Sequence, residues 1–305
     1  MTRATSLRAY AALLAAMLIW GLSFLAIKDA IEVVPIFSLL FMRFLLATVL
    51  LGVMAWSRRA VHLPKRDLLR LAGLSMLSPV GYFLFETYGV ANTQPSHVAV
   101  IIATIPIAVY LISFARRQER PTWTKTAGIL VAYAGIVLMI GFGQRETGAS
   151  LFGDLLIVGA VACAAARTTL IKDALTRVTP LQLTFYQFLF SLVVFAPLAA
   201  IDGVSWIGRL TTLSILEVLF LGVFCSAGAF LAMHYALSHL SATQVAVSAN
   251  LIPAITLFAE LMLLGTPLTL VKLGGTGLVI VGVVLTQLVS GPRSPRRSAI
   301  QERGA

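Results

Sequence analysis

The feature that most limits what this chain can fold into is a long stretch that occurs twice. Residues 81–138 align without a gap to residues 228–285, and fifteen of the 58 positions are then identical. The identical positions include Pro106, which matches Pro253, together with a tyrosine, a lysine and several glycines. Chance matches in an apolar chain would mostly pair Leu or Val. A repeat of this kind sets the architecture before any single motif does.

The composition identifies the environment of the chain. Of its 305 residues, 59% are hydrophobic and 11% are charged, whereas a soluble domain is about 45–50% apolar and roughly 25% charged. The apolar residues form runs of about 20, the length that crosses a bilayer as an α-helix. We therefore predict an all-α integral membrane protein with ten transmembrane helices, at residues 9–28, 35–56, 68–89, 95–115, 122–141, 152–172, 180–201, 215–237, 243–264 and 269–289.

The basic residues predict the orientation, because Lys and Arg accumulate in cytoplasmic loops. With the N-terminus inside, 17 of the 23 Lys and Arg residues lie on the inner side and 4 on the outer side. Arg43 and Arg167 lie within spans. We predict both termini in the cytoplasm (N-in/C-in) of a multi-pass protein of the cell's inner or plasma membrane. The net charge of +11 lies in short loops between spans, so no nucleic-acid partner is expected.

The repeat extends to the beginning of the chain. The tetrapeptide Ile27-Lys28-Asp29-Ala30 recurs at residues 171–174, so each half is a unit of five helices. Because five is odd, the second unit must thread the membrane in the opposite direction. We predict a first repeat at residues 1–143, an inverted second repeat at 150–290 and a basic cytoplasmic tail at 291–305. Inverted repeats are the usual basis of alternating access in secondary transporters.

Several short motifs carry a resemblance to a known family. They are Trp20-Gly21 with Phe24, Arg43-Phe44, Tyr235-Ala236-Leu237 leading into Ser241-Ala242-Thr243, and Glu119-Arg120. With the ten-helix pattern, they make the chain similar to EamA-type members of the drug/metabolite transporter (DMT) superfamily. The second half departs from the pattern, since Thr266 stands where the first half has Glu119. The resemblance implies a transporter of small metabolites in which helices four and nine line the central path.

Two matched prolines are candidates for hinges that line a central cavity. Pro106 and Pro253 lie about halfway along the fourth and ninth predicted spans. Proline inside a helix removes a backbone hydrogen bond and kinks the helix, and paired interruptions are a sequence pointer to a midplane site. The alternative is a structural kink without ligand contact.

Charged residues within spans are expected to face the bundle interior, because charge in hydrocarbon is costly. Tyr82 and Glu86 share a helix face near the outer end of the third span. Together with Arg43, His97 and Glu260 they predict an outer polar cluster that acts as a gate or in proton coupling. Glu86 or Glu260 would bind a proton or a substrate ammonium. The alternative for these residues is a static ion pair or contact with headgroups.

Trp20 and Asn250 complete the predicted substrate site with Tyr82 and Glu86. Trp20 is the one tryptophan at mid-depth, and Asn250 lies three residues before Pro253. The alternative for Trp20 is plain packing, and the alternative for Asn250 is a hydrogen bond that only bridges two helices. Arg167 and His234 lie near the inner interface, where extension of their side chains to the headgroups is the simpler account. Cys163 and Cys225 are interpreted as packing residues. The glycines at 128, 135, 275 and 282 are interpreted as surfaces of close helix packing.

These observations predict a secondary transporter that exports amino acids or related small metabolites, with the proton gradient as a candidate energy source. The alternative transport function is uptake of a sugar, nucleotide sugar or vitamin. A membrane enzyme is disfavoured, because the sequence has no nucleophile elbow and no paired-His motif. A scaffold would not need paired kinks or buried charges. We expect no cofactor and no bound metal, and the sequence leaves the oligomeric state open.

Overall fold

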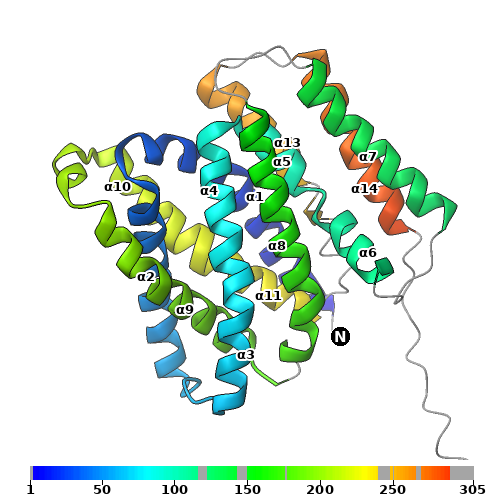
Figure 1. The fold of residues 1–305 in the computed structure, drawn as a ribbon. Coiled ribbons are helices and arrows are strands. Elements are labelled where there is room, and N and C mark those ends of the chain that lie inside the picture. Colours follow the sequence, from blue (N-terminus) through cyan, green and yellow to red (C-terminus); the bar gives the residue numbers. More distant parts are fainter. Residues whose placement is uncertain are drawn as a thin grey trace, which may run out of the picture.

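The computed structural model describes residues 3–115, 122–142, 150–175, 177–239, 248–249, 251–265 and 269–288. Every regular element in these ranges is helical (Figure 1). The α-helices are α1 (Arg3–Val33), α2 (Ile36–Ser57), α3 (Lys65–Ser75), α4 (Tyr82–Asn92), α5 (Pro95–Ile102), α6 (Ile105–Ala115), α7 (Trp123–Phe142), α8 (Leu151–Leu175), α9 (Pro180–Ile201), α10 (Thr212–Leu219), α11 (Ala229–His239), α13 (Leu251–Ala259) and α14 (Leu270–Leu288). Three π-helical segments, η1 (Met76–Gly81), η3 (Phe220–Gly228) and η4 (Glu260–Leu264), and the 3-10 turn η2 (Ser205–Arg209) connect some of them.

In the described part of the chain, seven helical stretches are long and apolar enough to cross a membrane. They are Leu7–Val33, Ile36–Ser57, Lys65–Asn92, Pro95–Ile112, Leu151–Thr168, Pro180–Ile201 and Thr212–Leu237. Three shorter apolar helices, Trp123–Leu138, Leu251–Leu264 and Leu270–Leu285, lie in the other predicted spans. The prediction of an all-α integral membrane protein is thus confirmed, whereas the count of ten spans stays a prediction.

The second helices of the two halves, α2 and α9, pack side by side in opposite directions. At the beginning of α2, the backbone N–H and the hydroxyl of Ser38 donate to Asp202 Oδ2 at 2.7 and 2.9 Å, just after the end of α9. Near the other end of α2, Gly52 faces the ring of Phe185, which lies near the beginning of α9. Paired positions that run in opposite numerical order define an antiparallel helix pair.

The last helices of the two halves, α7 and α14, form a second antiparallel pair, coloured green and red in Figure 1. A Cβ atom built on Gly135 would lie 2.6 Å from the carbonyl oxygen of Gly275. One built on Gly282 would lie 2.5 Å from the carbonyl oxygen of Gly128. Only glycine permits backbones to approach this closely. The prediction that these glycines form a close-packing surface is confirmed.

Contacts that helices of the first half make with the second half have equivalents, which their counterparts in the second half make with the first. Helix α1 packs against α11 and α13, and its counterpart α8 packs against α4 and α6. Four phenylalanines in the interior follow the same rule. The ring centroids of the counterparts Phe44 and Phe188 are 5.5 Å apart, and those of Phe83 and Phe230 are 6.0 Å apart. Residues that touch their own counterparts lie where the two halves meet, as in an isologous interface.

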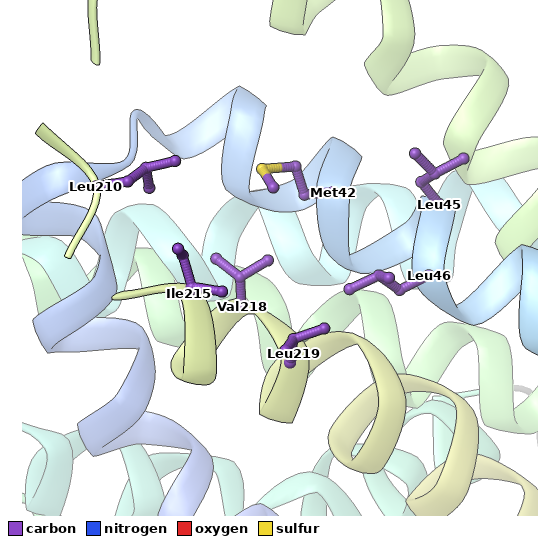
Figure 2. Close-up of a pocket in the computed structure, with 7 residues that line it drawn as sticks. All are labelled: Met42, Leu45, Leu46, Leu210, Ile215, Val218 and Leu219. Carbon is purple, nitrogen blue, oxygen red and sulfur yellow. The ribbon is translucent and has the colours of Figure 1, made fainter. Parts of the chain in front are cut away.

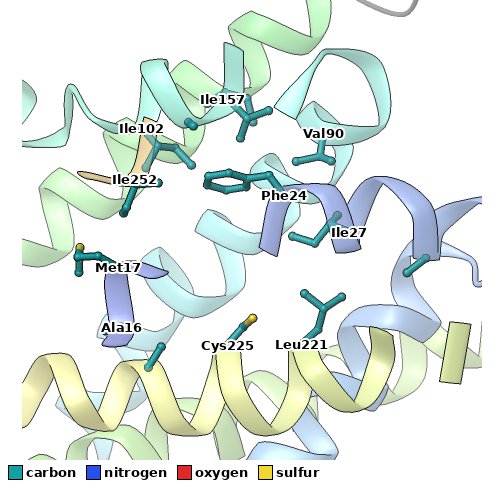
Figure 3. Close-up of a cluster of buried hydrophobic side chains, with 14 of the residues drawn as sticks. Ala16, Met17, Phe24, Ile27, Val90, Ile102, Ile157, Leu221, Cys225 and Ile252 are labelled. Carbon is teal, nitrogen blue, oxygen red and sulfur yellow. The ribbon is translucent and has the colours of Figure 1, made fainter. Parts of the chain in front are cut away.

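Helix α1 runs through the main hydrophobic core. Its residues Met17, Phe24 and Ile27 are at most 2% exposed. Figure 3 shows these side chains between Val90, Ile102, Ile157 and Ile252 on one side and Leu221 and Cys225 on the other. Cys163 and Cys225 are free thiols, as predicted for packing residues.

Several predicted spans are interrupted within the membrane. The third span contains η1, in which Ser78 leaves helical geometry at φ −157° and ψ 124°, and the eighth contains the longer η3. The fourth span divides into α5 and α6, with a turn at residues 103–104. Short π-helical segments inside α-helices often occur at functional sites, because they leave backbone groups without intrahelical partners. The interior next to η1 and η3 is therefore the first place to look for a site.

Candidate functional site

Arg43 extends from α2 into the interior and is only 2% exposed. Its Nε donates to the Ser226 hydroxyl of η3 at 3.1 Å. Its guanidinium lies over the ring of Phe83, 4.3 Å from the centroid, in a cation–π contact. Within the described part of the chain, its Nη1 has no hydrogen-bond partner. Arg43 therefore crosses from the first half to the second and keeps one donor free.

Tyr82 and Glu86 face Arg43 from α4. They lie one helical turn apart, and the Tyr82 hydroxyl donates to Glu86 Oε1 at 3.0 Å. Glu86 is 3% exposed and interacts electrostatically with Arg43. Its second oxygen, Oε2, accepts no hydrogen bond from the described residues. The structure thus brings together three of the residues predicted from the sequence.

Arg167 and His234 belong to the same interior region, although the sequence suggested contact with headgroups. Arg167, on α8, is 8% exposed, and His234, on α11, is 2% exposed. Arg167 interacts electrostatically with the Tyr82 hydroxyl and with His234. Its Nε and Nη1 lack partners among the described residues. His234 Nδ1 lies 2.8 Å from the hydroxyl of Thr184.

The burial of Arg167 and His234 corrects the interpretation of these two side chains. The signal that would have found them is the rule already applied to Arg43, that a charge within an apolar span faces the bundle interior. We call the set Arg43, Tyr82, Glu86, Arg167 and His234 the central polar row.

Trp20 and Gln187 border the row at the π-helical segments. Trp20 Nε1 donates to the carbonyl oxygen of Cys225 in η3 at 3.1 Å, and Gln187 Nε2 donates to that of Ser78 in η1 at 3.3 Å. Gln187 is the counterpart of Arg43 in the repeat. Each of these two counterparts therefore reaches the π-helical segment of the opposite half. Side-chain donors satisfy carbonyl groups that an irregular helix leaves open.

An apolar hollow between α2 and the region of α10 is a different kind of site. It has a volume of about 150 Å³ (Figure 2). Its lining consists of Met42, Leu45, Leu46, Leu210, Ile215, Val218 and Leu219. Leu45, Ile215 and Leu219 are also exposed on the outside of the bundle. This hollow offers no polar group to a metabolite.

Comparison with known proteins now identifies the family. The model of the EamA-like transporter family matches residues 7–141 and again residues 151–288. The chain belongs to the EamA-like transporter family. This membership, within the DMT superfamily, confirms the resemblance seen in the sequence and makes the protein a multi-pass membrane transporter.

The relatives of this EamA-like transporter are mostly named without a substrate. An uncharacterized transporter of Archaeoglobus fulgidus is 29% identical and covers 87% of this chain and 94% of its own. The uncharacterized transporter YcxC of Bacillus subtilis is 26% identical, over 90% of this chain and 91% of its own. A protein of Streptantibioticus cattleyicolor named "Probable terminal-alkyne amino-acid exporter" is 25% identical, over 90% of this chain and 91% of its own. A solved crystal structure with 17% identity has a TM-score of 0.65 and covers 94% of this chain and 98% of its own, so it shares the fold.

His97 and Glu260 of this EamA-like transporter have partners other than the central polar row. His97 Nδ1 lies 3.3 Å from Asp154 Oδ1, which also accepts from the Thr93 hydroxyl at 2.7 Å. Glu260 Oε1 accepts from the backbone N–H of Ser96 at 2.9 Å. These contacts satisfy groups around the beginning of α5, where the first N–H groups of a helix lack intrahelical partners.

Lys28 secures the other side of the same helix break. Its Nζ donates to the carbonyl oxygens of Val90, Ala91 and Thr93 at 2.9–3.1 Å. A cation at the C-terminal end of α4 also interacts favourably with the helix dipole. The groups around the α4–α5 connection therefore form a local network that holds two helix ends.

Replacing Glu260 with alanine is expected to destabilise the folded protein. The buried Ser96 N–H would lose its acceptor, which costs about 1–3 kcal/mol, and the 3.7 Å pair between Glu260 and Lys272 would be lost. The thermal unfolding temperature of the purified variant in detergent measures the effect. An unchanged unfolding temperature would contradict the assigned role.

The predicted hinge residues lie at the beginning of helices. Pro106 is the second residue of α6, directly after the turn at residues 103–104, and Pro253 is the third residue of α13. Proline is tolerated in the first helical turn, where its missing N–H has no intrahelical acceptor. Asn250 lies outside the described residues. The hinge role and the substrate role of these positions stay predictions. No group of three or more potential metal ligands occurs within the described ranges.

Proposed function

We propose that this EamA-like transporter exports amino acids or closely related small metabolites by alternating access. The observation that carries the proposal is the central polar row, in which charged side chains are buried but incompletely hydrogen-bonded. Buried polar atoms without partners are uncommon in native proteins, and intramembrane charges are functional-site candidates by default. The relative named as an amino-acid exporter supports this class of substrate.

The transport cycle in this proposal exchanges the conformations of two inverted repeats of ten helices, with both termini in the cytoplasm of the cell's inner or plasma membrane. The repeats would span residues 1–143 and 150–290. The antiparallel pairing of α2 with α9 and of α7 with α14 supports this arrangement, because inversion requires corresponding helices to run in opposite directions. The helix breaks before Pro106 and near Pro253 would serve as hinges.

Within the row, Glu86 would bind either a proton or the ammonium group of the substrate. Its unpartnered Oε2 and its hydrogen bond to Tyr82 leave one oxygen for a ligand. Competition between a proton and a substrate for one carboxylate is a direct way to couple their movements. Trp20 and Asn250 would line the substrate path, and Arg43, His97 and Glu260 would control access from the outside.

Uptake of a sugar, nucleotide sugar or vitamin is the alternative, and one assay separates the two. The purified protein is reconstituted into liposomes loaded with single unlabelled compounds, either L-amino acids or sugars, nucleotide sugars and vitamins, and uptake of the same labelled compound by counterflow is measured. Counterflow with at least one amino acid, absent from protein-free liposomes, is the expected result. Counterflow with sugars or vitamins and with no amino acid would refute the proposed substrate class. The direction of transport is then tested by analysis of the growth medium. Medium from cells that produce the protein should contain more of the same amino acid than medium from cells without it.

A further inference from the structure

The central polar row contains more positive than negative charge. Two guanidinium groups, those of Arg43 and Arg167, are buried there with one carboxylate, that of Glu86. A buried charge without a counter-ion is strongly unfavourable. The excess therefore points to an anionic group that is absent from the protein itself.

Arg43 does not account for this excess, because its interactions are largely provided by the protein. It donates to Ser226, lies over the ring of Phe83 and faces the Glu86 carboxylate. Glu86 is thus the internal counter-ion of Arg43.

Arg167 has no such partner. Among the described residues, its side chain makes no hydrogen bond and no ion pair, and two of its nitrogens are buried without an acceptor. Its electrostatic neighbours are the Tyr82 hydroxyl and His234. A protonated tyrosine and a histidine carry no negative charge, so neither serves as a counter-ion of Arg167. With 8% exposure, the side chain is also largely shielded from water and headgroups.

We propose that Arg167 binds a carboxylate group of the transported molecule. The inference rests on the proposed transport function and narrows its substrate class to carboxylic acids, with amino acids among them. Guanidinium groups bind carboxylates through charge-assisted hydrogen bonds, and Arg is suited to this role because it stays charged when buried. The Tyr82 hydroxyl donates to Glu86 and interacts electrostatically with Arg167, so an ammonium group on the same molecule could reach Glu86. Amines and neutral sugars offer no anionic group to compensate the charge of Arg167.

The test uses the purified full-length protein and sets of matched probes. Binding of each proteinogenic L-amino acid is measured by equilibrium dialysis and by the shift in thermal unfolding temperature. Each amino acid, whether or not it binds, is compared with its decarboxylated amine and its deaminated acid; for L-leucine these are isopentylamine and isocaproate. The wild-type protein should bind the amino acid and the acid, and should bind the amine at least tenfold more weakly. Equal binding of the amine would overturn the inference without any variant.

The Arg167→Gln variant should lose at least tenfold in affinity for both carboxylate probes. Because this change removes a buried, uncompensated charge, its unliganded unfolding temperature should equal or exceed that of the wild-type protein. The Arg167→Lys variant, which keeps the charge but not the planar donor set, should bind with intermediate affinity. Arg177, which is exposed just beyond α8, provides the matched control, and Arg177→Gln should bind like the wild-type protein. Wild-type affinity in Arg167→Gln would overturn the inference.

The same experiment separates this inference from the proposed function. If the wild-type protein binds deaminated acids but no amino acid, the amino-acid part of the proposed function fails and the role of Arg167 stands. If it binds amino acids and Arg167→Gln binds them equally well, the role of Arg167 fails and the proposed function stands. If it binds none of the probes, both are overturned.

Discussion

Replacing Gly282 with alanine is expected to prevent the protein from accumulating in a folded form. A Cβ atom at this position would lie 2.4 Å from the backbone nitrogen of Ala132 and 2.5 Å from the carbonyl oxygen of Gly128. These are backbone atoms of the facing helix, so no side-chain rotation can make room. Overpacking of a core typically costs about 1–3 kcal/mol, and a clash between two helix backbones should reach or exceed the upper end. Size-exclusion chromatography of the detergent extract measures the loss.

The same helix contains its own control. No atom lies within 4 Å of a Cβ atom built on Gly277, so Gly277→Ala should behave like the wild-type protein. The counterpart of Gly282 gives a second test, because a Cβ atom on Gly135 would lie 2.6 Å from the carbonyl oxygen of Gly275. Gly135→Ala should therefore be as damaging as Gly282→Ala. Normal yields of both would show that α7 and α14 do not pack through these glycines.

Replacing Glu86 with glutamine is expected to lower transport by at least tenfold while leaving the protein folded. The change keeps the shape of the side chain and its bond to the Tyr82 hydroxyl, but it removes the carboxylate that faces Arg43. The row would then contain two cations without any anion, and no group would remain to bind a proton or a substrate ammonium. Initial counterflow rates in proteoliposomes, normalised to the amount of protein, measure the loss.

Glu32 allows the specificity of this effect to be checked. It lies on the exposed surface near the end of α1, so Glu32→Gln makes the same chemical change outside the interior. Counterflow by Glu32→Gln should equal that of the wild-type protein. Wild-type counterflow by Glu86→Gln, at every pH tested, would remove Glu86 from the mechanism.

The sequence predicted the helices well because the membrane imposes a simple rule on them. Each run of about 20 apolar residues must satisfy its backbone internally, and the described part of every run that we assigned contains helix. The glycines of α7 and α14 were also predictable, because their spacing repeats in both halves. The proximity of Arg43, Tyr82 and Glu86 was expected since intramembrane charges face inward.

Other features could not be predicted because they depend on packing between distant segments. Nothing in the composition of residues 220–228 distinguishes the π-helical η3 from an α-helix. The contacts of Glu260 with Ser96 join residues 164 positions apart and secure a helix end, so a carboxylate that looks like Glu86 in sequence has a different environment. Arg167 was judged by its depth along the helix, whereas its burial depends on helices distant in the sequence that pack against α8, such as α4.

Labelling of two loops tests whether two halves of opposite orientation enclose the central polar row. Lys65 lies between the second and third spans of the first half, Arg209 lies in the equivalent connection of the second half, and both are exposed. Lys65→Cys and Arg209→Cys variants are treated in intact cells with a membrane-impermeant maleimide. The wild-type protein, treated in the same way, measures the labelling of the native thiols Cys163 and Cys225. If the second half is inverted relative to the first, Arg209→Cys is labelled in intact cells and Lys65→Cys only after permeabilisation. Labelling of both variants from the same side would contradict it.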